Sequence, residues 1–155
     1  MERLRYDDDT AFTLADDAAT VARVVRTTSA DKLRATKFDE WTALEVLGHV
    51  ADMAEIFAER VRRIVSGDKP KLVSVDQDQI HSERRNNERD PMELAKRMQT
   101  AHGEIVRMLQ ERVNRDRLGV HAEWGEVDAA HIAAYQARHA HQHVTDVAAR
   151  FPPTN

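Results

Sequence analysis

Three histidines have the residue type and the spacing of a metal site. His139 and His143 are four residues apart in the run His139-Ala-His-Gln-His143, so on a helix their side chains project from one face. One helix presents two imidazoles to one ion in this way. His49 closes a second run, Trp41-Thr-Ala-Leu-Glu-Val-Leu-Gly-His49. Three imidazoles leave one position open on a tetrahedral metal, which favours catalysis or ligand binding over a purely structural site.

Other polar residues compete for the role of a metal ligand. His131 and His141 lie off the face shared by His139 and His143, and His141 points about 200° away from it. A fourth protein ligand could close the site, and the candidates are His81, Asp76, Asp78 and His102. These residues also have explanations that involve no metal. The two aspartates fall in a polar stretch, and His102 borders an apolar stripe as a core histidine would.

The open position could be used in two ways. A bound water could ionise near neutral pH and attack an electrophile, or the metal could activate the thiolate of a small thiol. The chain has no cysteine, so such a thiol would come as a cosubstrate. Glu45 and Asp52, one turn before and after His49, are candidates for a general base, and neither is assigned. Trp41 and Trp124 could line the mouth of a pocket or simply pack in the core.

Four segments have the apolar spacing of amphipathic helices. They cover about residues 10–26, 43–66, 91–109 and 129–149. A capping box, Thr42-Ala-Leu-Glu45, starts the second helix, and Asp90 followed by Pro91 starts the third. No segment alternates convincingly as a strand, although residues 71–75 could form a short extended piece. The pattern predicts an all-α, single-domain four-helix bundle over residues 1–155.

The histidines also predict how the helices are connected. His49 lies roughly 9 Å from the start of the second helix, and His143 roughly 9 Å from the end of the fourth. They reach one level only if these two helices are antiparallel. That requires an up-down-down-up bundle with a long connection between the second and third helices. The stretch from Ser66 to Arg89, roughly 24 residues, is far longer than ordinary bundle loops, and so predicts the same topology independently.

Composition excludes several classes of protein. The chain has 155 residues, 41% of them hydrophobic, and a net charge of -4. A mildly acidic domain lacks the positive field that nucleic-acid binding needs. We find no apolar run long enough for a membrane span or a signal peptide. We therefore expect a cytoplasmic protein with a small-molecule substrate, no nucleic acid partner and no membrane association.

The chain resembles the DinB-like superfamily of four-helix proteins over about residues 38–149. The segment from Trp41 to His49 is similar to the opening of the family's second helix, and the segment around His139 and His143 to the signature of its fourth. Gly119-Val-His121 through Gly125 is similar to the loop before that helix. The family includes metal-dependent hydrolases and thiol-dependent transferases and isomerases related to mycothiol-dependent maleylpyruvate isomerase.

The resemblance implies a divalent metal, usually zinc or nickel, bound by His49, His139 and His143. It also implies the up-down-down-up topology and often a homodimer, and it allows a low-molecular-weight thiol as cosubstrate. One residue departs from the pattern. Family members commonly carry glutamine three residues after the last histidine, where this chain has Asp146. A carboxylate there could orient His143 or face solvent.

Overall fold

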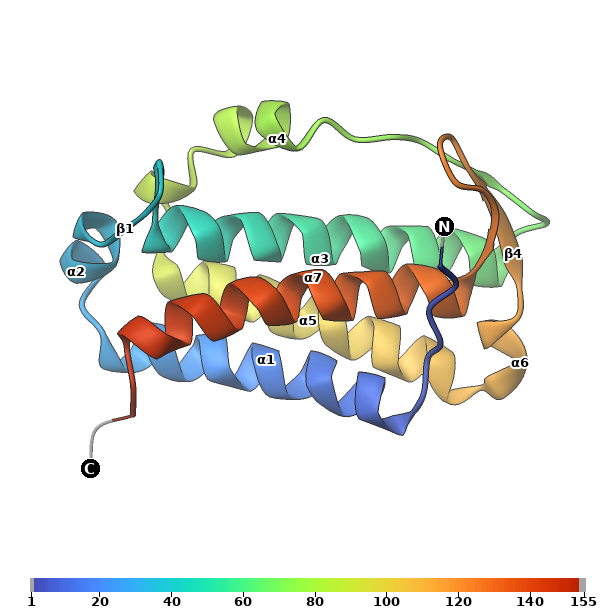
Figure 1. The fold of residues 1–155 in the computed structure, drawn as a ribbon, viewed down its shortest axis with the longest axis horizontal. Coiled ribbons are helices and arrows are strands. Elements are labelled where there is room, and N and C mark those ends of the chain that lie inside the picture. The colour runs from blue at the N-terminus through green and yellow to red at the C-terminus, as the bar shows by residue number, and fades with distance from the viewer. Residues whose placement is uncertain (1, 154–155) are drawn as a thin grey trace.

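Four long helices form the body of the protein in the computed structural model, which describes residues 2–153 (Figure 1). They are α1 (Asp8–Thr27), α3 (Ala43–Ser66), α5 (Pro91–Gln110) and α7 (Ala129–Arg150). Both α1 and α3 pack against α5 and α7, so the four helices surround one core. The predicted all-α four-helix bundle is confirmed.

The direction of the helices matches the topology predicted from the histidines. In Figure 1, α1 and α7 run one way while α3 and α5 run the other way, which is up-down-down-up. The connection between α3 and α5 returns along the outside of α3 to make this possible. It is not a plain loop, because it contains α4 (Gln77–Arg84) and a 3-10 turn, η1 (Asn86–Glu88).

Short strands lie at the two ends of the bundle, and one of them falls within residues 71–75, where the sequence allowed a short extended piece. The hairpin β1 (Lys37–Phe38) and β2 (Trp41–Thr42) follows a short helix, α2 (Ala30–Ala35). At the other end, β4 (Leu118–His121) pairs with β3 (Lys71–Leu72) in parallel and with β5 (Gly125–Asp128) antiparallel, after helix α6 (Arg112–Arg115). The sequence therefore allowed β3, whereas the other strands were not predicted. Strands of two to four residues are too short to show a period-two pattern.

The helix starts follow the local chemistry of the sequence. Thr42 and Glu45 form the predicted capping box at α3, with Thr42 Oγ1 accepting from the Glu45 amide at 3.1 Å. Asp90 caps α5 ahead of Pro91, and Asp128 caps α7. These side chains satisfy backbone donors that a helix leaves unpaired. Within residues 2–153, no helix is both long and apolar enough to cross a membrane.

His102 is a buried histidine of the core rather than a metal ligand. It is 1% exposed, and its Nδ1 lies 2.8 Å from the carbonyl oxygen of Leu14 while its Nε2 lies 3.1 Å from the Gln136 amide nitrogen. Both contacts are satisfied by a neutral ring with its proton on Nδ1. Burial lowers the pKa of His102 from 6.5 to about 4, opposed in part by the bond to Leu14.

This histidine is expected to make the fold less stable in acid. As pH falls below 6.5, the unfolded chain takes up a proton that the folded ring rejects, so stability present at neutral pH is lost down to about pH 4. Urea unfolding at pH 6.5 and pH 5 measures the loss. His102→Gln should lose about 2 kcal/mol less than the wild type over this interval. An equal loss in both proteins would show that His102 does not carry the effect.

Candidate metal centre

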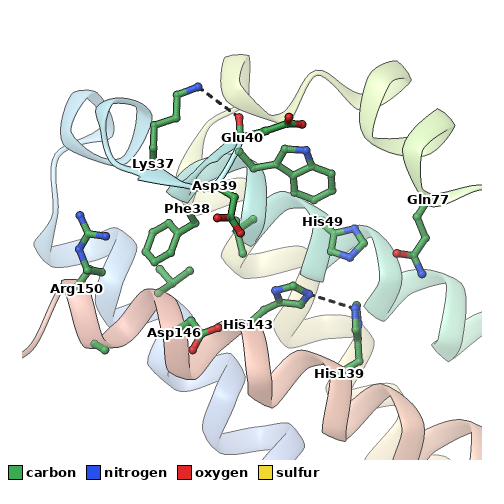
Figure 2. Close-up of a pocket in the computed structure, with 14 residues that line it drawn as sticks. Lys37, Phe38, Asp39, Glu40, His49, Gln77, His139, His143, Asp146 and Arg150 are labelled. Atoms are coloured by element: carbon green, nitrogen blue, oxygen red, sulfur yellow. Dashed lines mark hydrogen bonds between the residues drawn. The ribbon is translucent and has the colours of Figure 1, made fainter.

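The fold brings His49, His139 and His143 together, as predicted (Figure 2). His49 comes from the N-terminal part of α3, and the other two come from the C-terminal part of the antiparallel α7. The ring centre of His49 lies 5.2 Å from that of His139 and 5.4 Å from that of His143. One nitrogen from each ring can be chosen so that all three lie within 4.8 Å of one another.

Burial keeps these imidazoles neutral. His49 is 4% exposed, and His139 and His143 are half-buried. Burial first, and then repulsion by the neighbouring imidazoles, lowers the pKa of His49 from 6.5 to about 3. The same causes lower the pKa of His139 to about 4. Burial also lowers the pKa of His143, opposed by the nearby carboxylate of Asp146. A neutral imidazole is the form that binds a metal.

The donor geometry fits a divalent metal. Nε2 of His139 and Nε2 of His143 are 3.2 Å apart. Two imidazole nitrogens on a tetrahedral zinc, each about 2.0–2.1 Å from the ion, would be separated by about 3.3 Å. Among the residues that the structure describes, no other group of three histidine, aspartate or glutamate side chains has its ligand atoms this close together.

A pocket of about 960 Å³ opens from the histidines. Its walls come from α3, from α7, from the β1–β2 hairpin and from Gln77 at the start of α4. Trp41, on β2, lines this pocket and lies edge-on to His49 with ring centres 5.2 Å apart, which is one of the two alternatives that the sequence left open. Trp124 does not reach this site, because it stacks on His121 with ring centres 4.1 Å apart and does not line the pocket.

Glu45 and Asp52, the two candidates for a general base, have other partners. Glu45 Oε1 accepts from the Thr42 amide at 3.0 Å, and its Oε2 lies 3.2 Å from His81 Nε2. Asp52 is 1% exposed and accepts from Arg97 at 2.7 Å and from Asn86 at 3.0 Å. Neither lines the pocket. The carboxylates that do are Asp39, Glu40 and Asp146.

Three of the four candidates for a fourth ligand have partners elsewhere, and the other is exposed. His81 stacks on Trp41 with ring centres 3.8 Å apart. Asp76 caps α4 by accepting from the amides of Asp78 and Gln79. Asp78 is exposed, and His102 lies in the core. None of the four lines the pocket, so the histidine cluster keeps an open side.

One close contact holds the long connection against α3 beside His49. Asn86, in η1, is fully buried, and its Nδ2 donates to Asp52. A Cβ atom on Gly48 would lie 2.2 Å from Asn86 Cγ, so only glycine leaves room for Asn86 here. This contact fixes η1, which follows α4, and the ring of His81 on α4 lies against Trp41.

Several pocket residues were missed by reasoning from sequence. Arg150 could have been found, because it lies two turns after His143 on the same stripe of α7. Lys37 and Asp39 belong to the unpredicted hairpin, which turns at Asp39 with a φ of 55°. Aspartate tolerates this left-handed conformation better than most residues, but a single aspartate is too weak a signal to predict it.

Comparison with known proteins agrees with this architecture. Residues 13–147 match the DinB superfamily. YfiT from Bacillus subtilis, described as a probable metal-dependent hydrolase with an unusual four-helix bundle topology, is similar in structure with a TM-score of 0.78. The two are 18% identical, and the match covers 93% of this chain and 86% of YfiT.

A second similar structure is mycothiol-dependent maleylpyruvate isomerase. Its TM-score is 0.70 at 12% identity, and the match covers 90% of this chain. A histidine-to-alanine mutant of that enzyme matches with the same TM-score at 11% identity. The match spans only 60% of the isomerase. Comparison with curated protein sequences finds no match.

Proposed function

The chain belongs to the DinB superfamily, and on that premise we propose that it is a metal-dependent enzyme. Its His49, His139 and His143 bind one divalent ion, zinc or nickel. The observation that carries the proposal is the meeting of three neutral imidazoles, one buried and two half-buried, at one wall of an open pocket. A structural zinc site would be closed by a fourth protein ligand, and none of the candidates for that ligand lines the pocket.

The bound ion would supply a Lewis acid that promotes ionisation of a water molecule or a thiol. The chain's own residues prepare the place for it. Burial holds the three imidazoles as neutral donors, and Trp41 covers one side of His49. Asp146 places a carboxylate close to His143, which offsets part of the ion's charge. The open side leaves room for a substrate against the hairpin.

We favour a small-thiol-dependent transferase over a hydrolase. A thiol has a pKa of about 8.5, far below the value of about 15.7 for bulk water, so it needs less help to ionise. This matters because Glu45 and Asp52 have other partners and cannot be counted as bases for activating water. The absence of cysteine from the chain means that the thiol comes from solution. Hydrolysis is the runner-up, with Asp39 or Asp146 as the available carboxylate.

Turnover measurements distinguish these functions from a non-catalytic binding role. Zinc-loaded, nickel-loaded and metal-free protein would be assayed for conjugation of low-molecular-weight thiols to electrophiles, and for hydrolysis of esters. We expect conjugation that requires both metal and thiol and is lost in His143→Ala. Metal-dependent ester hydrolysis without a thiol would favour the runner-up. If metal and thiol bind but neither reaction occurs, the protein is a binding protein and the proposed activity is wrong.

Tryptophan fluorescence should report the ion at this site. The ring of Trp41 lies 5.2 Å from that of His49, and open-shell Co²⁺ quenches an indole at such short range. We expect Co²⁺ to quench most of the emission of Trp124→Phe, which keeps Trp41, and little of that of Trp41→Phe. The opposite result would place the ion near Trp124 and its neighbour His121, and would contradict the proposed ligands.

A further inference from the structure

One wall of the pocket is formed by the residues of α7 that follow His143 on the same face of the helix. His143, Asp146 and Arg150 succeed one another at helical spacing, and all three line the pocket. Arg150 is the last residue of α7. It follows His143 by two turns, which is about 10 Å along the helix axis. The pocket thus presents a positive charge at the end opposite His139 (Figure 2).

The guanidinium of Arg150 is placed to receive an anion. Its Cζ lies 5.2 Å from the centre of the Phe38 ring, on the hairpin. Among residues 2–153, no carboxylate oxygen lies within 4.0 Å of it, not even that of Asp146 one turn away. Lys37 lines the same end of the pocket, with its Nζ donating to the carbonyl oxygen of Glu40 at 3.3 Å. An arginine stacked on an aromatic ring still offers its planar fork to a carboxylate.

Negative charges lie between this end and the histidines. Asp146 is close enough to His143 to oppose the lowering of its pKa. The Asp39 side chain lies in the same space between Phe38 and the histidines (Figure 2). A carboxylate that stopped beside these two residues would be repelled, while one that reached Arg150 would be attracted. This arrangement of charges would favour an anionic ligand that is long enough to reach Arg150.

We infer that the site takes an elongated ligand with a carboxylate about 10 Å from the atom that meets the metal. The inference rests on the proposed function, because it takes the histidine end as the metal end. A simpler role for Arg150 is to balance the negative partial charge at the C-terminal end of α7. That role predicts an effect on stability and none on ligand choice.

Thiols of two lengths test the inference without any need for turnover. Binding to Co²⁺-loaded protein would be measured from the thiolate-to-cobalt absorption band. The long pair is 8-mercaptooctanoate and 8-mercaptooctanol, whose extended chains approach the span from the ion to Arg150. The short pair is 3-mercaptopropionate and 3-mercaptopropanol. We expect the long carboxylate to bind about tenfold more tightly than the long alcohol, and the short carboxylate to bind more weakly than the short alcohol.

Variants assign the effect to Arg150. In Arg150→Gln the long carboxylate and the long alcohol should bind with equal affinity. In Arg150→Lys the long carboxylate should still bind somewhat more tightly than the long alcohol, because the positive charge remains. Arg138→Gln removes an exposed arginine of α7 that does not line this pocket, and should keep the full advantage of the long carboxylate. Equal affinities within the long pair, or an advantage that survives in Arg150→Gln, would overturn the inference while leaving the thiol function intact. Failure of all four thiols to bind would overturn both.

Discussion

Replacing His143 with alanine is expected to remove the metal. Protein purified without a histidine tag should contain about one ion per chain, and His143→Ala less than about 0.2. The loss is large because, in the described part of the chain, the pocket is lined by no histidine besides these three. Even the loss of a residue that merely orients a ligand costs about 10–100-fold in affinity, so loss of a ligand should cost more than about 100-fold.

Thermal unfolding gives a second measure of the same change. Zinc at about 100 times its Kd should stabilise the wild type by about 2.7 kcal/mol, which raises the Tm by about 5–10 °C for a chain of this size. His143→Ala should show no such rise. His141→Gln is the matched control, because His141 projects from α7 toward Asp17, 3.1 Å away, rather than into the pocket. Equal metal content in His143→Ala and His141→Gln would mean that the ion binds elsewhere.

The meeting of the three histidines could be predicted from the sequence because it depends only on residue spacing and on the geometry of a helix. A spacing of four residues fixes His139 and His143 to one face of a helix, and the rise per residue fixes the level of His49. Together with the long connection, these numbers determine the direction of α3 relative to α7. The helix starts at Thr42 and Pro91 were equally predictable, because capping depends on residues within one turn.

The rest of the site depends on contacts between distant residues. Arg150 lines the pocket because the hairpin places Phe38 against it. A strand of two residues has no sequence pattern from which this contact could be predicted. The place of α4 depends on Asn86 packing against Gly48, two residues that belong to different elements. Glycine inside a helix normally lowers the stability of the helix. The sequence alone did not show that Gly48 leaves space for the side chain of Asn86.

Gly48→Ala is expected to be strongly destabilising for this reason. The new Cβ would lie 2.2 Å from Asn86 Cγ and 2.4 Å from Asn86 Cβ, and the Asn86 side chain is fully buried. Moving Asn86 would also break its hydrogen bond to Asp52. Overpacking and a lost bond to a buried carboxylate should together cost about 2–4 kcal/mol in urea unfolding. Hydrogen exchange should show the segment 77–88 opening with the mutation, since η1 is its anchor.

A matched glycine and a double mutant make the cause of this loss testable. A Cβ atom added to Gly103, inside α5, would meet nothing within 4 Å, so Gly103→Ala should stabilise by about 0.5–1 kcal/mol through helix propensity alone. The same gain in helix propensity is expected at Gly48, but there the clash with Asn86 outweighs it. In an Asn86→Gly background, Gly48→Ala should therefore change sign and become neutral or stabilising. If the cost of Gly48→Ala were the same with and without Asn86, the two residues would not be coupled, and the anchor of the long connection would have to lie elsewhere.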